Sequence, residues 1–449
     1  MKNRKDSNRP SLVAILAGVI GAFAAAGSVA IGQEVRGGYE SNTPAETRPF
    51  QIVLPSSHLL GDWAGLRTQL EDAGITPSLT LISDFAWNPS GGKSQGATQA
   101  SSIGLSLKFD LDRMAGIQGG SVLVSLCERF GSDLSLQYIG NIFTVQDVFG
   151  VEQFHLSDVA YQQKLFNDRV EFRVGRITTA DDFLVSPYNY LFMQQGFDGF
   201  PQGIAFNAPG MTVYPMGTWG ALIKGKPTQR SYAMVGFYNG DPSVQNDDRH
   251  GVDFSLDGPL FAVGEIGYQI NGLPGDNGLL GNYKAGVWYD DATLPDFRTG
   301  AATRGSWGFY GLFDQVVIPF GPSGSNRGLS IFGSVMFGTD PAVQQMPFFF
   351  TAGVAGRGFA ESRPEDWLGL GVVYGHFSED RQDAQRQAQQ LDPRLGVQDY
   401  ETAIELLYRF YLHEHSVFFQ PDLQYIVRPG GTGNIDNALV LGAQLGINF

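Results

Sequence analysis

Three stretches near the C-terminus decide the fold: residues 402–412 read TAIELLYRFYL, 417–427 read VFFQPDLQYIV and 437–449 read NALVLGAQLGINF. In the first stretch the even positions are mostly apolar, whereas the odd positions include Glu405 and Arg409. In the other two the odd positions carry an apolar set, and the even positions include Gln, Asp, Gly and Asn. Alternation with a period of two predicts β-strands that have one apolar and one polar face.

These strands predict a membrane-spanning barrel rather than a helical bundle. After residue 31 the sequence has no apolar run of eighteen residues, which a transmembrane helix would need. In lipid every backbone amide needs an internal partner, and a closed barrel supplies one with strands of about 9–11 residues. A soluble sandwich seldom needs Phe and Tyr so often on its apolar faces. The predicted fold class is all-β, a transmembrane antiparallel up-and-down β-barrel.

The connections between strands support the same fold. Residues 413–416 form a tight turn, whereas 429–436 is a Pro- and Gly-bearing loop and 378–398 is long and polar. Because outer-membrane barrels have short periplasmic turns and longer external loops, this pattern places Phe449 on the periplasmic side. Further strands are predicted at 119–126, 170–174, 232–238, 284–289, 308–317, 329–337 and 369–374. The length suits sixteen strands around a water-filled lumen, and fourteen or eighteen strands fit nearly as well.

The N-terminus is predicted to be an export signal. The first nine residues contain four Lys and Arg, and residues 12–31 form an apolar run rich in Ala and Gly. This order is typical of a secretory signal peptide, with cleavage after Ala30 or Gly32, where small side chains flank the cut. An uncleaved membrane anchor is the alternative, because twenty apolar residues can span a bilayer. The predicted organisation is a signal peptide over 1–32, a polar segment over 33–57 and the barrel over 58–449.

Composition excludes several functions. The 449-residue chain has 59 Gly, 33 Phe and 17 Tyr, an excess that suits closely spaced strands and aromatic girdles better than helices. Cys127 is the single cysteine, so an internal disulfide and a cysteine metal cluster are excluded. The net charge of −15 argues against a nucleic-acid partner, since phosphate backbones select basic surfaces. No cofactor and no metal site is predicted.

Six motifs follow one another in a fixed order along the chain. They are LGDWAGLR at 60–67 with Leu70 and AGI at 73–75, Glu128-Arg129, FRVGR at 172–176, DDF at 181–183, NGLPG at 271–275, and PDLQYIVRPGG at 421–431. In this order they resemble the carbohydrate-selective porins of the OprB family, over nearly all of the chain that follows the signal. The family opening more often reads Trp-Gly-Gly than the Trp63-Ala64-Gly65 found here.

The resemblance implies a sixteen-stranded barrel in the outer membrane of a Gram-negative bacterium. Such a porin would let small hydrophilic solutes, glucose and related mono- or oligosaccharides, diffuse passively into the periplasm. Its partners would be these sugars and outer-membrane lipid. Members of the family differ in substrate, so a general or organic-acid-selective porin stays open as an alternative, as does the choice between a monomer and a homotrimer.

Strand parity indicates which side chains face the lumen. A sugar-selective pore needs charged or amide groups that replace water hydrogen bonds, and aromatic rings for stacking. In the strand at 119–126 the outward positions are even, so Arg129 is expected to point inward, and the same parity points Glu171 and Arg173 inward. The predicted constriction residues are Arg129, Glu128, Arg173, Glu171, Arg176 and Asp182, with Asp84, Trp219, Arg363 and Asp366 as weaker candidates. For each of them an ordinary, solvated place in the lumen wall is the alternative.

Two further segments are predicted to shape the pore. The acidic pair Asp181-Asp182 leads into an aromatic stretch with Tyr188, Tyr190 and Phe192, which we expect to fold into the lumen as a constriction loop. Residues 62–74 place apolar side chains at helical spacing and predict a short helix that caps the periplasmic end.

Three other functions compete with a porin. A barrel enzyme such as a lipid hydrolase would need a poised serine and histidine, but the sequence has six His and no recognisable nucleophile motif. A surface adhesin would show longer external loops and a lumen filled with bulky side chains. A gated receptor-type transporter would need a plug domain and a 22-stranded barrel, for which the chain is too short. The sequence therefore predicts a channel and no catalysis.

Overall fold

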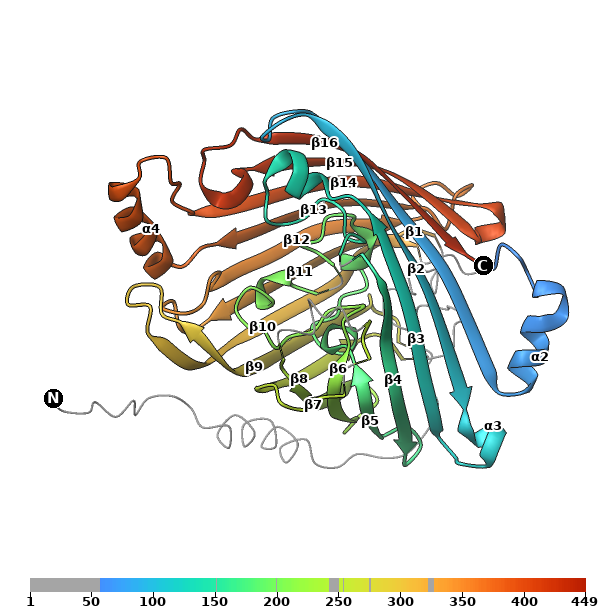
Figure 1. Cartoon of the computed structure of the whole chain (residues 1–449). Helices are drawn as coiled ribbons and strands as arrows, with labels where there is room; N and C mark the ends of the chain where they lie inside the picture. The colour runs from blue at the N-terminus through green and yellow to red at the C-terminus, as the bar shows by residue number, and fades with distance from the viewer. Residues whose placement is uncertain are drawn as a thin grey trace, which may run out of the picture.

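The computed structural model describes residues 57–449 except 151, 199, 242–249, 253, 274–275 and 322–326. The predicted signal peptide and most of the polar segment lie outside the described residues. Over the part that is described, the chain forms sixteen antiparallel strands, each paired with its neighbours in chain order (Figure 1). The first strand pairs with the last and closes the barrel. The predicted fold class and the strand number of sixteen are confirmed.

The strands are β1 Ile75–Ser90, β2 Gly96–Asp110, β3 Gly120–Gly131, β4 Phe154–Leu165, β5 Val170–Ile177, β6 Thr218–Gly225, β7 Ser231–Asn239, β8 Leu260–Ile270, β9 Gly281–Pro295, β10 Ala302–Pro319, β11 Gly328–Gly338, β12 Phe348–Arg357, β13 Trp367–His376, β14 Tyr400–Leu412, β15 Val417–Val427 and β16 Ala438–Asn448. The helices are α2 Leu66–Asp72, α3 Leu111–Ala115 and α4 Glu379–Leu391. Single helical turns are η2 Trp63–Gly65, η3 Ser135–Ile139, η4 Thr179–Asp181, η5 Asn189–Leu191, η6 Gln202–Ile204, η8 His413–His415 and η9 Pro429–Gly431. Among the described residues, no helix is long and apolar enough to cross a membrane.

The three C-terminal strands lie where the alternation predicts them. On β14 the apolar Ile404, Leu406 and Phe410 are exposed on the outside, whereas Glu405 and Arg409 are buried on the inside. The seven upstream predictions coincide with β3, β5, β7, β9, β10, β11 and β13. The predictions missed β1, β2, β4, β6, β8 and β12; β2, for example, has Gln, Ser and Thr on both faces near one end, which weakens the alternation.

The barrel has two different ends (Figure 1). We call the end that carries α2, α3 and the C-terminus the terminal end; it also carries the tight turn η8 between β14 and β15. The opposite end, here the loop end, carries α4. The sequence predicts only a long polar loop at 378–398, and α4 escaped prediction because its residues are polar on every side. Its N-terminus is capped by Ser378, whose Oγ accepts from the Arg381 N–H at 3.3 Å.

The predicted helix near the N-terminus is present as η2 and α2, but its apolar spacing does not hold it in place. Leu66 is 51% exposed, whereas Arg67 is buried. The Arg67 guanidinium donates to the carbonyl oxygens of Pro77 at 3.2 Å and Phe449 at 2.6 Å, and it stacks on the Trp63 ring at 4.5 Å. A single arginine therefore ties the start of the barrel to its last residue.

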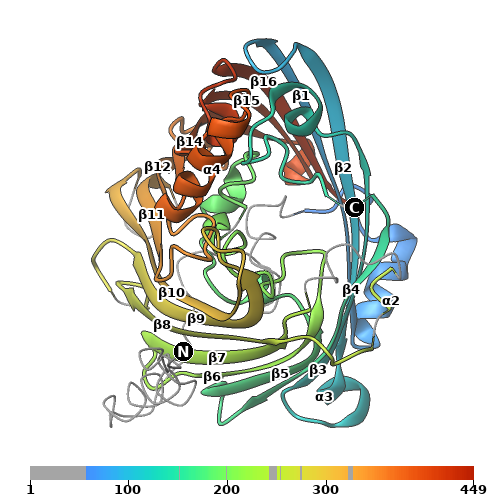
Figure 2. The same cartoon turned by 60° about the vertical axis from the view of Figure 1, so that its left-hand side comes forward.

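Two connections from the loop end fold back into the barrel. We call residues 132–153, between β3 and β4, the first inserted loop, and residues 178–217, between β5 and β6, the second inserted loop. Figure 2 shows both segments inside the ring of strands. Their side chains Phe143, Phe183, Phe192 and Phe197 are fully buried and form the apolar core of the molecule. The second loop lies in the lumen as predicted, whereas no sequence pattern indicated the first.

Candidate functional site

The lumen contains a cavity of about 90 Å³ between the barrel wall and the two inserted loops. Strands β1, β2, β3, β14, β15 and β16 supply the wall, and both loops supply the rest. Its lining combines basic, acidic and aromatic side chains, among them Arg129, Arg409, Asp147, Asp198, Tyr190 and Tyr214. Such a lining can bind a hydroxyl-rich solute by hydrogen bonds and stacking.

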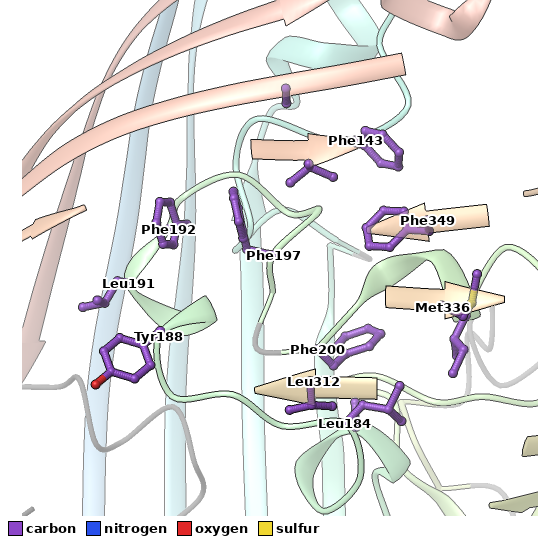
Figure 3. Packing of buried hydrophobic residues seen from close by; sticks show 14 of the residues in the cluster. Phe143, Leu184, Tyr188, Leu191, Phe192, Phe197, Phe200, Leu312, Met336 and Phe349 are labelled. Atoms are coloured by element: carbon purple, nitrogen blue, oxygen red, sulfur yellow. The ribbon is translucent and has the colours of Figure 1, made fainter. Parts of the chain in front are cut away.

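Aromatic packing makes the second inserted loop a rigid part of this site (Figure 3). The rings of Phe192 and Phe197 stack with their centroids 4.2 Å apart, and Tyr188 stacks on Phe332 of β11 at 5.8 Å. The Tyr188 hydroxyl also lies 2.8 Å from the Ser330 hydroxyl of β11. Aromatic pairs of this kind each add about 0.5–1.5 kcal/mol beyond the area that they bury, so the loop is held on the wall opposite the cavity.

Five carboxylates of the barrel wall hold the backbone of the inserted loops. Glu405 accepts hydrogen bonds from the N–H groups of Met193 and Gln194 at 2.8 and 2.9 Å. Glu401 accepts from the N–H groups of Ile142 and Phe143, both at 2.8 Å, and Glu265 accepts from that of Leu184 at 2.8 Å. Asp290 accepts from the Gly210 N–H at 2.7 Å, and Asp84 accepts from the Val148 N–H at 3.3 Å. Buried backbone N–H groups need an acceptor, so these wall carboxyl groups hold the loops that narrow the pore.

Arg129 on β3 connects the wall to both inserted loops. Its guanidinium donates to the carbonyl oxygen of Phe149 in the first loop at 3.3 Å and to that of Tyr214 in the second at 3.1 Å. The same group lies 5.9 Å from the centre of the Tyr214 ring. Arg129 therefore presents a positive charge to the cavity from a position that two loops define.

Arg409 on β14 presents a second guanidinium to the cavity, and it is only 1% exposed. Its Nε donates to Gln420 at 2.7 Å and its Nη2 donates to Gln444 at 3.1 Å. The group also lies 4.0 Å above the Phe418 ring. A planar guanidinium can satisfy two amide acceptors and an aromatic face at once, which fixes its direction.

Carboxylates oppose these two arginines. The Gln444 amide donates to Asp84 at 3.0 Å and to Asp147 of the first loop at 3.2 Å, so the two acids lie side by side. Removal from water raises the pKa of Asp147, whereas the Asp84 carboxyl and the Arg129 and Arg409 guanidiniums oppose that rise. Removal from water also raises the pKa of Asp198 in the second loop. The cavity thus places carboxyl groups beside guanidinium groups within a small volume.

A family model described as "Carbohydrate-selective porin, OprB family" matches residues 94–449. The chain belongs to this family. It is 27% identical to Porin B of Pseudomonas aeruginosa over 427 residues, which cover 87% of this chain and 91% of that one. It is 28% identical to a protein of Acinetobacter baylyi named putative porin QuiX, over 87% of this chain and 93% of that one.

A solved structure agrees with the family assignment. The high-pH structure of Pseudomonas putida OprB has a TM-score of 0.81 and 25% identity, and it covers 88% of this chain and 98% of that one. With the sixteen-stranded barrel, these matches make the protein an outer-membrane sugar porin of the OprB family and a channel rather than an enzyme.

In this OprB-family barrel, three of the predicted residues come together outside the cavity. Arg173 of β5 lies 3.0 Å from Asp182 of the second loop and 3.9 Å from Glu171. Burial raises the pKa of Asp182 to about 6, and the charge of Arg173 opposes that rise. Of the predicted residues, Arg129 does line the cavity. Asp84 lies behind the lining and holds Val148 and Gln444.

Three other predicted residues do not reach the cavity. Glu128 is exposed, and its strand partners are the exposed Ile103 and Phe154, so it lies on the outer face of the barrel. Trp219 packs against the exposed Phe254 with ring centroids 5.6 Å apart. The buried Arg176 pairs in register with Trp219 and donates from Nε to the Leu156 carbonyl at 3.2 Å. The outward position of Glu128 follows directly from strand parity, because its neighbour Arg129 faces inward.

The last two predicted residues, Arg363 and Asp366, lie at the terminal end in the connection between β12 and β13. Arg363 binds both oxygens of Asp366, at 2.7 and 3.0 Å, and donates to the Tyr411 carbonyl at 2.9 Å. Asp366 in turn accepts from the Tyr411 N–H at 3.1 Å. These bonds join a turn to β14, and neither residue lines the cavity.

Sequence reasoning missed Arg409, Asp147 and Asp198. Arg409 was visible on the charged face of its strand, but alternation shows only that a residue faces inward, not that it lines the narrowest point. Asp147 and Asp198 lie in inserted loops, where no periodicity marks the position of a side chain.

Proposed function

We propose that neutral sugars, glucose and related mono- or oligosaccharides, pass this porin through the cavity between the wall and the inserted loops. Arg129 and Arg409 donate hydrogen bonds to sugar hydroxyls, Asp147 and Asp198 accept them, and aromatic rings receive the apolar face of the sugar. The observation that carries this proposal is the meeting of Arg129 from β3 and Arg409 from β14 in one cavity with Asp147.

The mixture of hydrogen-bond donors and acceptors in the cavity favours a neutral solute. Two guanidiniums face three carboxyl groups there, those of Asp147, Asp181 and Asp198. Each arginine is also bound to carbonyl or amide oxygens of the protein, so it offers only part of its donors to a solute. Several modest contacts of this kind suit a pore, because a tightly bound solute would block its own diffusion.

The orientation and the route of export belong to the same proposal. The terminal end, with its short turns, lies in the periplasm, and the loop end faces outward. Residues 1–32 direct the chain through the inner membrane and are removed after Ala30 or Gly32. Mass spectrometry of the protein purified from outer membranes tests this, because an intact N-terminus in the mature protein contradicts a cleaved signal.

Single-channel recording in a planar bilayer tests the transport proposal. Glucose and maltose should reduce the current saturably, and Arg129→Gln should raise the half-blocking concentration of sugar by about tenfold. Glu128→Gln is the matched control, because it changes the neighbouring residue on the outer face, and it should shift the half-blocking concentration by less than about twofold. Equal behaviour of the two variants would remove Arg129 from the pathway. A channel that sugars do not block contradicts the proposal.

A further inference from the structure

Gln444 is the residue that the last strand, β16, directs into the cavity. It stands between Gly442 and Gly446, which share its inward direction because side chains alternate along a strand. Side chains of other elements fill the space beside both glycines. A Cβ at Gly442 would lie 2.6 Å from the Met193 Cε, and a Cβ at Gly446 would overlap the ring of Phe418. The Gln444 side chain is only 3% exposed, so its polar atoms depend on partners within the protein.

Gln444 belongs to a row of polar side chains that crosses the seam where the barrel closes. In register it pairs with Asp84 of β1 on one side and with Gln420 of β15 on the other. Gln420 in turn accepts a hydrogen bond from the Nε of Arg409 on β14, at 2.7 Å. The row therefore runs from a carboxyl group through two amides to a guanidinium, on four neighbouring strands of the wall.

The neighbours of the Gln444 amide fix its direction. A guanidinium can only donate, so the amide oxygen faces the Arg409 Nη2, at 3.1 Å. The amide nitrogen donates to the Oδ1 atoms of Asp84 at 3.0 Å and Asp147 at 3.2 Å. One amide group thus separates the guanidinium of Arg409 from both carboxyl groups, and Asp147 lies within electrostatic reach of Arg409.

Without this amide, Arg409 would bind the carboxyl groups itself. A carboxyl group accepts a hydrogen bond in either protonation state, and a bond between a guanidinium and an ionised carboxylate is about twice as strong as a neutral one. The arginine side chain is long, and the acids Asp84 and Asp147 lie only one amide group farther along the wall. The guanidinium would then turn toward the acids and away from a solute in the cavity.

We propose that Gln444 is a positioning residue of the sugar pathway, whose amide keeps Arg409 apart from Asp84 and Asp147 and holds the guanidinium in the direction of the solute. This role rests on the proposed function, in which Arg409 and Asp147 bind sugar hydroxyls. A glutamine suits the position because an amide can accept from the guanidinium and donate to the carboxyl groups at the same time. A carboxylate there could not donate, and an ammonium group could not accept.

The first test measures how glucose blocks single channels of Gln444→Ala. The rates of association and dissociation of glucose follow from the kinetics of the block. If Gln444 acts by positioning Arg409, the dissociation rate should rise by about tenfold, whereas the association rate and the open-channel conductance should change by less than about twofold. A residue that only supports the wall would change the conductance or the association rate, since both depend on the bore of the pore. The matched control is Gln387→Ala on the exposed side of α4, which should leave all three quantities unchanged.

The second test repeats the substitution in the Arg409→Gln background. No guanidinium is then present to bind the acids, so adding Gln444→Ala should shift the half-blocking concentration of glucose by less than about twofold. Equal shifts with and without Arg409 would overturn the positioning role, because they would show that Gln444 acts through another group.

The outcomes also separate this role from the proposed function. If glucose blocks the wild type and Gln444→Ala equally well, the positioning role is wrong and the sugar pathway stands. A wild-type channel that glucose does not block contradicts both. Should Gln444→Ala fail to form channels, Gln444→Asn replaces it, because an amide that is one methylene shorter cannot reach Arg409 and the acids together. It should raise the dissociation rate by a smaller factor, and an unchanged rate would overturn the role.

Discussion

Glu405 of β14 and Met193 of the second inserted loop lie 212 positions apart in the chain and are joined by a hydrogen bond of 2.8 Å from the Met193 N–H to the Glu405 carboxylate. The other carboxylate oxygen accepts from the next residue, Gln194, at 2.9 Å. The loop that narrows the channel has little regular structure of its own, so a side chain of the wall supplies the acceptors that its backbone needs. The bore of the pore therefore depends on buried carboxylates of the barrel.

Glu405→Gln should loosen the second inserted loop without unfolding the barrel. A glutamine offers one acceptor oxygen instead of two and turns an N–H₂ donor toward a backbone N–H, which costs about 1–3 kcal/mol for an unsatisfied buried group. We expect faster cleavage within residues 178–217 by a protease and a noisier, larger single-channel current. Glu379→Gln on α4, an exposed position, is the control. Equal cleavage rates in the two variants would show that Glu405 does not hold the loop.

The ion selectivity of the channel should change near pH 6 because of Asp182. Above that pH the Asp182 carboxylate is ionised and balances Arg173, whereas below it the acid is neutral and the positive charge of Arg173 remains. Preference for anions, measured as the reversal potential in a KCl gradient, should therefore rise as the pH falls through about 6. In Asp182→Asn this preference should be present already at neutral pH and the step should be absent. A step of unchanged size in Asp182→Asn would place its origin elsewhere.

The same group makes a prediction about stability. The folded-state pKa of Asp182, about 6, lies above the ordinary value of 3.8, so the folded protein holds this proton more tightly than the unfolded chain does. The contribution of Asp182 to the free energy of unfolding is therefore full at low pH and is lost as the pH rises from about 4 to about 6. Thermal unfolding followed across this range should show a smaller loss in Asp182→Asn than in the wild type. Asp112→Asn, exposed at the terminal end, should behave as the wild type does.

Arg409 should not be replaceable by lysine. Its Nε and Nη2 bind Gln420 and Gln444 at the same time, and a lysine ammonium cannot reproduce that fork or the stacking on Phe418. We expect Arg409→Lys and Arg409→Gln both to raise the half-blocking concentration of glucose by about tenfold, whereas the exposed Arg394→Gln leaves it unchanged. Full sugar block in Arg409→Lys would mean that the charge alone matters.

Arg363→Ala should lower stability and leave sugar binding intact. The substitution removes two hydrogen bonds to Asp366 and one to the Tyr411 carbonyl, of which each contributes about 1 kcal/mol at most at this partly exposed position. The thermal midpoint should fall, while the half-blocking concentration of glucose should stay the same. A change in sugar block at an unchanged thermal midpoint would show that Arg363 contributes to sugar selectivity.

The sequence by itself determined the class of the fold, because the requirement behind it is local. A strand in lipid must alternate between an apolar and a polar face, and β14, β15 and β16 show this pattern within a few residues of their observed bounds. Parity also placed Arg129, Glu171 and Arg173 correctly on the inside. The same rule, applied without exception, places Glu128 outside, where the structure has it.

Only the tertiary structure decided which inward residues meet. Closing the barrel brings β1 beside β16, and the inserted loops bring Asp147 and Asp198 to the wall that carries Arg129 and Arg409. Alternation with a period of two shows that a side chain faces the lumen. The position of that side chain along the barrel axis depends on the register of all sixteen strands. The side chains of the inserted loops follow no repeating pattern of apolar and polar residues. The positions of these loops depend on wall carboxyl groups such as that of Glu405, which is far from the loops in sequence. The cavity is therefore a property of the closed barrel.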